Sequence, residues 1–237
     1  MSKEWRVLPE APLTFINECS NYHPLIAQLL YNRGLRSQQQ IQAFFNPDFD
    51  KMHDPFLFRD MDRAVKRIRQ ALQKKEKIVV HGDYDADGVT SAAVMYKTLQ
   101  ILGANVSVFI PHRELDGYGI NMKTAQNFIT EGVGLVITVD CGVTNVKEIA
   151  VLKESGIDVI VTDHHEPPQV LPDAYAIIDP KIKEDNYPFI HLSGAAVAYK
   201  VVQALLDQRL KVRGLETKLF DWGGIEGFKK WLLDIVA

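Results

Sequence analysis

The chain has 237 residues, 46% of them hydrophobic and 24% charged, with a formal net charge of −3. This is the composition of an ordinary globular protein of one or two domains, without the overall basic excess of many nucleic-acid-binding proteins. No apolar run could span a membrane, no signal-peptide core follows the first residues, and two cysteines cannot form a disulfide framework, so we expect a cytoplasmic protein with no membrane partner.

The first third of the chain is predicted to be helical. Residues 23–34 carry apolar side chains at helical spacing and end on a glycine, and residues 37–47 open with a serine cap and close at a proline. Residues 59–72 form a further amphipathic pattern, whose arginines, Arg67 among them, we expect on the solvated face. We therefore assign residues 1–75 to a helical N-terminal segment packed on the core.

From Lys77 onward, short β-branched runs alternate with helical patterns. The predicted strands are residues 78–80, 106–110, 135–139, 159–161 and 176–178. The predicted helices lie near residues 88–102, 122–131, 145–154 and 194–208. Strands that are apolar on both faces and separated by helices indicate a parallel sheet. Residues 76–237 are thus predicted to be an α/β domain: a parallel five-stranded sheet with helices on both faces.

Acidic and imidazole side chains follow these strands. They are His81, Asp83, Asp85 and Asp87 after the first strand, His112 and Arg113 after the second, Asp140 after the third, Asp163, His164 and His165 after the fourth, and Asp179 after the fifth. Because the carboxyl ends of parallel strands meet at one edge of a sheet, we expect these residues on one rim, where such folds bind ligands.

The stretch HGDYDADG, residues 81–88, favours a metal site over two other kinds of loop. It lacks the glycine spacing of a phosphate-binding loop, and it lacks the glutamate at the twelfth position of an EF-hand. Carboxylates with imidazoles suit Mn²⁺, Zn²⁺ or Fe²⁺, and oxygen-rich sets lean towards Mn²⁺ or Mg²⁺. One aspartate after a strand is often only a helix cap or turn former. The whole set exceeds the needs of one ion and predicts two ions that share a carboxylate.

Several segments resemble a known family. VVHGDYDADGVTSAAVM, VITVDCG and VTDHHEPP are similar to the first three motifs of the DHH phosphoesterase superfamily. Within this superfamily, four further segments resemble the RecJ family of single-stranded-DNA-specific exonucleases. They are HPLIAQLLYNRG, AFFNP, IPHRELDGYGI and LSGAAVAYKVVQAL. The resemblance implies two-metal-dependent phosphodiester hydrolysis of single-stranded DNA from the 5′ end, in DNA repair and recombination. It implies two Mn²⁺ ions, with Mg²⁺ as the alternative.

The resemblance also implies roles for individual residues. The implied metal ligands are His81, Asp85, Asp87, Asp140 and His164. Asp140 would bridge the two ions, His165 would face the substrate phosphate, and Asp83 and Asp163 would lie behind the ligands. On the residues themselves, we add Thr90 and Ser91, at a helix start, as phosphate contacts. We also add His112 on the same rim and Arg113 as a phosphate-gripping catalytic residue.

The chain departs from the RecJ pattern at its C-terminal end. RecJ-like chains continue into a fourth motif with another metal-binding aspartate, then into DHHA1-type and OB-like domains, whereas this sequence stops at Ala237. We therefore expect a DHH domain truncated before the fourth motif, which is weak or inactive as a nuclease on its own. Two alternatives stay open: a DHH phosphodiesterase acting on oligoribonucleotides or cyclic dinucleotides, and an inactive binding module.

Overall fold

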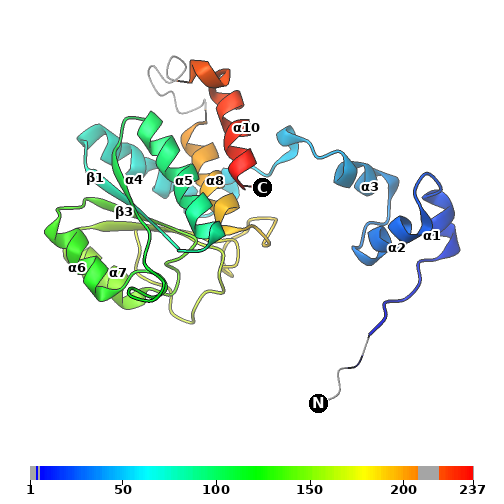
Figure 1. The fold of residues 1–237 in the computed structure, drawn as a ribbon, viewed down its shortest axis with the longest axis horizontal. Helices are drawn as coiled ribbons and strands as arrows, with labels where there is room; N and C mark the ends of the chain where they lie inside the picture. The colour runs from blue at the N-terminus through cyan, green and yellow to red at the C-terminus, as the bar shows by residue number, and fades with distance from the viewer. Residues whose placement is uncertain (1–3, 5, 208–218, 237) are drawn as a thin grey trace. The chain divides into compact units, whose positions relative to one another are not determined.

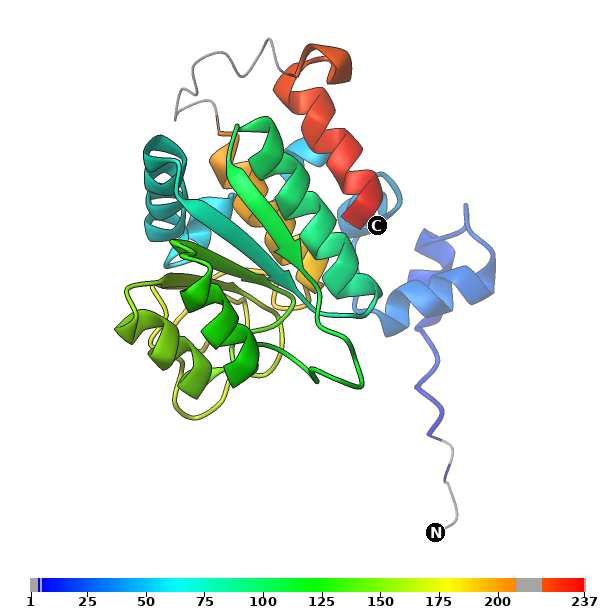
Figure 2. The ribbon, with the colours of Figure 1, turned by 60° about the vertical axis from the view of Figure 1, so that its left-hand side comes forward.

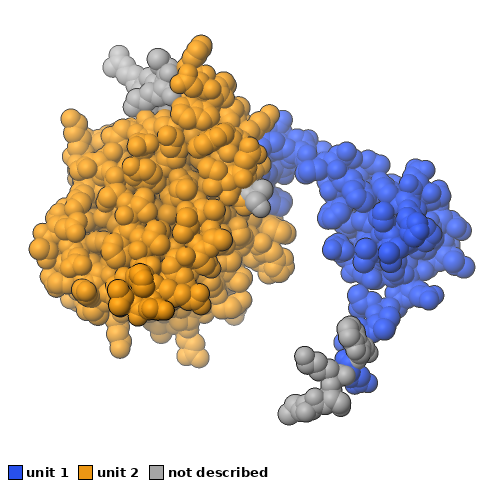
Figure 3. Space-filling model, in the orientation of Figure 1, with its two compact units in different colours: residues 1–53 blue, residues 54–237 orange. Residues whose placement is uncertain are grey.

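A computed structural model describes residues 4, 6–207 and 219–236 (Figure 1). The chain divides into two compact units, residues 1–53 (unit 1) and 54–237 (unit 2), drawn in two colours in Figure 3. The helix α4 (Met61–Lys74), which the sequence analysis grouped with the N-terminal segment, belongs to unit 2. Among the described helices, none has both the length and the apolarity needed to cross a bilayer.

Unit 1 is a small helical body. Its elements are α1 (Leu13–Glu18), α2 (Pro24–Asn32), α3 (Gln38–Phe45) and the 3₁₀ turn η1 (Phe49–Lys51). α3 begins at a capping box, in which the Ser37 hydroxyl accepts from the Gln40 N–H and the Gln40 side chain accepts from the Ser37 N–H. Its buried apolar residues are Ala11, Phe15, Cys19, Ala27, Leu30 and Ile41. The two helices predicted near residues 23–34 and 37–47 are confirmed.

Unit 2 is built on a five-stranded parallel sheet, as predicted. The strands are β1 (Lys77–Gly82), β2 (Asn105–Phe109), β3 (Leu135–Val139), β4 (Asp158–Thr162) and β5 (Ala176–Ile178). Their order is β2-β1-β3-β4-β5. The chain passes from β1 to β2 at one edge of the sheet, returns to β3 on the other side of β1, and continues through β4 to β5 at the opposite edge. In open α/β sheets, ligands bind beside the carboxyl ends of the strands where the order reverses. Here that point lies between β1 and β3.

Helices cover both faces of this sheet (Figures 1 and 2). α4, α5 (Ala86–Ile101) and α8 (Gly194–Leu205) lie on one face, and α6 (Met122–Thr130) and α7 (Val146–Glu154) lie on the other. α10 (Gly224–Val236) packs outside α5 and α8, and η2 (Pro55–Leu57) and η4 (Phe220–Trp222) are short turns. Burial on both faces explains the continuous apolar runs in the inner strands, and every residue of β3 is buried. The edge strand β2 is partly exposed.

The expectation that Arg67 lies on the solvated face of its helix is wrong. Its side chain is 6% exposed, with Nε 2.5 Å from Asp158 and Nη2 2.6 Å from Glu76. Nη2 also donates to the carbonyl oxygen of Gly134 at 3.0 Å. Burial of this charge is tolerated because two carboxylates pair with it. Arg67 thereby ties α4 to the amino ends of β1, β3 and β4.

The strand register brings the rim acids level with one another. Gly82 pairs with Val139, Val139 with Thr162, and Thr162 with Ile178. The residues that directly follow these four are all aspartates: Asp83, Asp140, Asp163 and Asp179. Four adjacent strands therefore each end, at the same level, in a carboxylate. The sheet itself, rather than any loop, gathers the candidate metal ligands.

Candidate metal centre

The first cluster on the rim is acidic. Asp83, Asp85 and Asp140 each offer an oxygen, and these atoms lie within 4.8 Å of one another. Burial raises the pKa of Asp83 and of Asp140, and the negative charge of Asp85 raises both further. Asp85 also caps α5, because its Oδ1 accepts from the Gly88 N–H at 2.9 Å. Three crowded carboxylates, of which Asp83 and Asp140 resist ionisation, form an environment in which a cation is favoured.

Asp140 is held in an uncommon backbone conformation. Its φ is +60°, in the left-handed region, and its N–H donates to the Thr162 carbonyl oxygen at 2.9 Å. Gly194, at the start of α8, lies directly against its side chain: a Cβ placed there would be 2.2 Å from Asp140 Oδ1. The close approach of α8 to this carboxylate therefore requires glycine at position 194.

We expect Gly194→Ala to weaken Mn²⁺ binding roughly tenfold or more and to lower the free energy of unfolding by about 1–3 kcal/mol, because the added methyl group displaces Asp140. Calorimetric titration with Mn²⁺ and urea denaturation measure the two effects. Adding Asp140→Gly should restore stability, since glycine suits a positive φ, but not metal binding. Gly194→Ala protein that binds Mn²⁺ like its parent would contradict the proposed contact.

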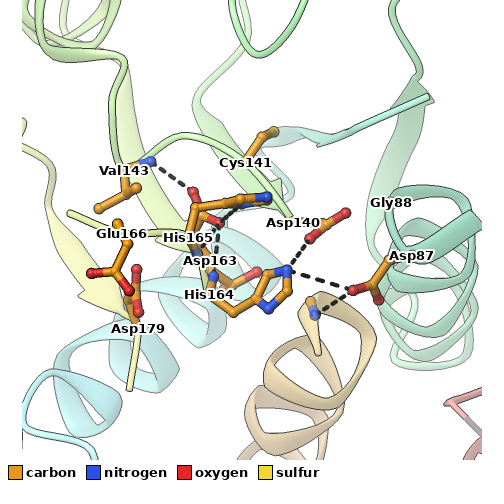
Figure 4. A network of polar contacts seen from close by, with 12 residues as sticks. Asp87, Gly88, Asp140, Cys141, Val143, Asp163, His164, His165, Glu166 and Asp179 are labelled. Atoms are coloured by element: carbon orange, nitrogen blue, oxygen red, sulfur yellow. Dashed lines mark hydrogen bonds and ion pairs between the residues drawn. The ribbon is translucent and has the colours of Figure 1, made fainter. Parts of the chain in front are cut away.

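The second cluster joins Asp140 to the two histidines, again with one atom from each within 4.8 Å of the others. His164 Nε2 lies 3.1 Å from Asp140 Oδ1 and 3.6 Å from Asp87 Oδ2 (Figure 4). His164 Nδ1 lies 2.9 Å from the Leu192 carbonyl oxygen, and since a carbonyl only accepts, this nitrogen carries the proton. In the neutral ring, Nε2 then has a free lone pair for a metal ion.

Asp87 links this cluster to α8. Its Oδ2 accepts from the Gly194 N–H at 2.8 Å and its Oδ1 from the Ala195 N–H at 2.7 Å. A carboxylate is stabilised there because the first N–H groups of a helix have no partners within the helix. Asp87 thus lies beside His164, whereas the acidic cluster is formed by Asp83, Asp85 and Asp140.

Asp163 organises the turn that carries the two histidines. Its carboxylate is fully buried: Oδ1 accepts from the N–H groups of His164 and His165 at 2.7 and 3.2 Å, and Oδ2 accepts from the Val143 N–H at 3.0 Å. His165 Nδ1 lies 2.7 Å from the same Oδ1 (Figure 4). Burial opposes ionisation of Asp163, but the hydrogen bonds from His165 and Val143 outweigh it and lower its pKa. The ring that Asp163 orients is that of His165.

His81 lies beneath the rim in an apolar pocket. Its ring is stacked on Phe109, with centroids 5.4 Å apart, and meets Phe128 edge-on at 6.2 Å. Nδ1 lies 3.6 Å from Cys141 Sγ, and the buried Nε2 has no hydrogen-bond partner among the described residues. Burial lowers the pKa of His81 to about 4, so the ring is neutral at ordinary pH. A neutral imidazole with an open nitrogen is in the state that metal binding requires.

We expect the metal-free protein to lose stability by up to about 1 kcal/mol per pH unit through His81 as pH falls from 6.5 towards 4. The unfolded chain binds a proton below pH 6.5, whereas the folded state keeps His81 neutral down to its lowered pKa. Urea denaturation in the presence of a chelator should show that the free energy of unfolding falls less steeply with decreasing pH for His81→Leu than for the parent. His112→Leu, at an exposed histidine, is the matched control; equal slopes for the parent and His81→Leu would contradict the assignment.

Two predicted phosphate contacts do not reach the rim through their hydroxyl groups. Thr90 Oγ1 donates to the Ala86 and Asp87 carbonyl oxygens at 2.8 and 3.0 Å, and Ser91 Oγ donates to the Asp87 carbonyl oxygen at 2.6 Å. Ser91 is fully buried. Both hydroxyl groups thus satisfy carbonyl groups of their own helix, as is common for serine and threonine inside helices.

The predicted residues after β2 lie on an exposed loop. His112 Nδ1 accepts from the Glu114 N–H at 3.3 Å, so the ring helps to shape the turn. The Arg113 guanidinium lies 5.3 Å from the centroid of the Tyr84 ring. This contact places Arg113 next to the HGDYDADG loop, with its charge available to a ligand.

Tyr118 is a rim residue that the sequence analysis missed. Its hydroxyl lies 3.1 Å from His165 Nδ1 and 3.4 Å from the Asp140 carbonyl oxygen, and burial raises its pKa above the ordinary value, so it remains a phenol. The Asn145 amide holds the loop by accepting from the Ile120 N–H at 3.1 Å and donating to the Ile120 carbonyl at 2.8 Å. Gly119, with φ +71°, has no room for a side chain against Asn145. The sequence feature that could have indicated this residue is a tyrosine placed between two glycines, Gly117 and Gly119.

The donor set fits divalent cations. Clustered carboxylates and imidazoles suit Mn²⁺ or Mg²⁺. His81 Nε2 has no hydrogen-bond partner among the described residues, and His164 Nε2 faces Asp140 and Asp87. The two clusters offer Asp83, Asp85, Asp140, His164 and His165 as the residues that would hold them. Of the other predicted ligands, Asp87 lies beside His164 and His81 lies beneath the rim, and neither belongs to a cluster of three. Asp140 alone belongs to both clusters of three. Asp179 belongs to neither; it is buried, and burial raises its pKa to about 7.

Comparisons with known proteins identify the relatives of this chain. Residues 77–222 match the DHH family, N-terminal domain. The single-stranded-DNA-specific exonuclease RecJ of Bacillus subtilis is 46% identical over 185 residues, which are 78% of this chain and 24% of that protein. The crystal structure of Thermus thermophilus RecJ with Mn²⁺ is 32% identical, with a TM-score of 0.68, and the match covers 90% of this chain and 30% of that protein chain. The structure of the same protein with Mg²⁺ is 26% identical, with a TM-score of 0.53, and the match covers 98% of this chain and 30% of that protein chain. The chain thus spans about a quarter to a third of the length of these relatives.

Proposed function

The chain belongs to the DHH family, and from this premise we propose that it is the metal-binding part of an exonuclease of RecJ type, which hydrolyses phosphodiester bonds of single-stranded DNA with Mn²⁺ or Mg²⁺. One observation carries the proposal: two clusters of ligand atoms share Asp140 at the point where the strand order reverses. Two ions that share a carboxylate are suited to phosphoryl chemistry. DNA repair and recombination, the role implied by the resemblance, belongs to this proposal.

Mn²⁺ or Mg²⁺, when bound, supplies a Lewis acid for the phosphoryl oxygens and lowers the pKa of water for attack. The residues around the clusters supply donors for the substrate. The hydrogen bond to Asp163 raises the pKa of His165, so that a proton on its Nε2 is available to a phosphate oxygen above pH 6.5. The Tyr118 hydroxyl and the Arg113 guanidinium are two further donors beside the centre.

The test uses the chain as it stands. Calorimetric titration should show Mn²⁺ binding, with proton release in buffers of differing ionisation heat, because His164 has a raised pKa in the metal-free protein and must lose its proton to bind a metal. Slow Mn²⁺-dependent hydrolysis of bis(4-nitrophenyl) phosphate should accompany it and vanish in chelator. No binding at millimolar Mn²⁺ by folded protein would refute the proposal.

The choice of nucleic-acid substrate distinguishes the alternative functions that the sequence analysis left open. Labelled single-stranded DNA should be cut slowly, below about 1 per second, because the chain spans only part of the length of its relatives. The matching RNA strand and cyclic dinucleotides are the competing substrates. Faster hydrolysis of either would favour a relative that acts on those substrates over an enzyme of RecJ type.

A further inference from the structure

A depression lies beside the carboxyl end of β5, outside the two metal clusters. It has a volume of about 460 Å³, and its walls include Glu166, Lys181, Lys183, Ile190 and His191. This volume falls within the range of roughly 300–1,000 Å³ typical of small-ligand sites. None of these five residues belongs to either cluster of ligand atoms.

The depression is lined by residues next to those of the metal centre. Glu166 directly follows His165, and Figure 4 shows it beside Asp179 next to the histidine turn. The Lys181 N–H donates to Asp179 Oδ1 at 2.9 Å. His191 precedes Leu192, whose carbonyl oxygen contacts His164 Nδ1. Its walls are therefore placed by the same segments that hold His164 and His165.

Two lysines line this depression. Lys181 Nζ is 3.7 Å from Glu166 Oε1, but the Glu166 side chain is 86% exposed, and such a surface pair contributes little. Lys183 is exposed and forms no ion pair in the part of the chain that the structure describes. The Asp185 carboxylate is already occupied, because it accepts from the N–H groups of Arg59 and Tyr187.

The same depression offers a surface for a nucleobase. Ile190 is 49% exposed. The His191 ring meets the Phe189 ring at 5.8 Å between centroids, and Phe189 is 47% exposed. Cations bind the backbone of a single strand, and apolar and aromatic side chains support its bases. Of these residues, Ile190 and His191 line the depression together with Lys181 and Lys183, and Phe189 lies next to it in the sequence.

We infer that this depression binds the nucleotide next to the scissile phosphate in a single strand. The inference rests on the proposed function, because the metal centre fixes where the scissile phosphate lies. Lys181 and Lys183 contact the phosphate of this nucleotide, and Ile190 and His191 contact its base. The site favours strands longer than the bond being cut, without selecting a base sequence.

The experiment measures fluorescence anisotropy of a labelled phosphorothioate oligothymidylate, which resists hydrolysis, with Mn²⁺ over a series of salt concentrations. Lys181→Gln/Lys183→Gln should bind about tenfold more weakly, and the slope of log affinity against log salt should become shallower by about 0.7, because the two lysines neutralise one phosphate. Ile190→Ala should weaken binding without changing the slope. Lys147→Gln, at an exposed lysine on α7, is the control and should match the parent.

The outcomes separate this inference from the proposed function. An unchanged slope for the double variant overturns the nucleotide site. So does failure of the parent chain to bind the strand while it still hydrolyses bis(4-nitrophenyl) phosphate, and the proposed function then stands. If the parent chain neither binds Mn²⁺ nor hydrolyses that diester, the proposed function fails and this inference fails with it.

Discussion

Replacing Asp140 by alanine is expected to abolish Mn²⁺-dependent phosphodiester hydrolysis and to reduce the number of Mn²⁺ ions bound. Asp140 is the residue common to both clusters, so the change removes a ligand atom from each at once. The variant should stay folded without metal, because burial and neighbouring acids raise the pKa of Asp140 and its charge is unfavourable there. Calorimetry with Mn²⁺ and the rate on bis(4-nitrophenyl) phosphate measure the effect.

Two further variants make the Asp140 result specific. Asp173→Ala, at an aspartate that is 75% exposed, should behave like the parent. Asp83→Ala should cost less than Asp140→Ala, roughly 10–100-fold in rate, because Asp83 belongs to one cluster and its Oδ1 is already bonded to the Tyr84 N–H at 2.7 Å. Near-normal rates for Asp140→Ala would refute the shared carboxylate.

Replacing Asp163 by alanine is expected to cost about 3 kcal/mol or more in folding stability and to misplace His165. The change leaves the N–H groups of His164, His165 and Val143 without their buried acceptor. Because the pKa of Asp163 is lowered, its contribution is present above the unfolded value near 3.9 and is lost as pH falls through the folded value. Because the pKa of His165 is raised, its contribution is present below about 6.5 and is lost as pH rises through the folded value.

The parent should therefore exceed Asp163→Ala in stability most clearly between about pH 4 and pH 6.5, where both partners are charged in the folded and in the unfolded protein. Urea denaturation in chelator at several pH values measures the difference. Asp173→Ala serves again as the surface control. A variant as stable as its parent across this window would show that the turn is held by other contacts.

The sequence by itself determined the architecture of unit 2 and most of its rim. β-branched runs such as Leu135–Val139 are apolar on both faces, so only a covered parallel sheet accommodates them. Once the strands are parallel, residues that follow them must gather at one edge, which is why Asp83, Asp140 and Asp163 were predicted to lie together. Both inferences need only the pattern of residues within each strand and the residues that directly follow it.

The tertiary structure alone decided which rim atoms meet. Gly194 is 54 positions from Asp140 in the sequence, and only the packing of α8 brings it against that carboxylate. The same packing sets Asp87 on the start of α8, and the loop held by Asn145 sets Tyr118 beside His165. Spacing along a chain fixes which side of a strand or helix a residue occupies, whereas distances between elements follow from register and packing, which involve residues far apart in sequence.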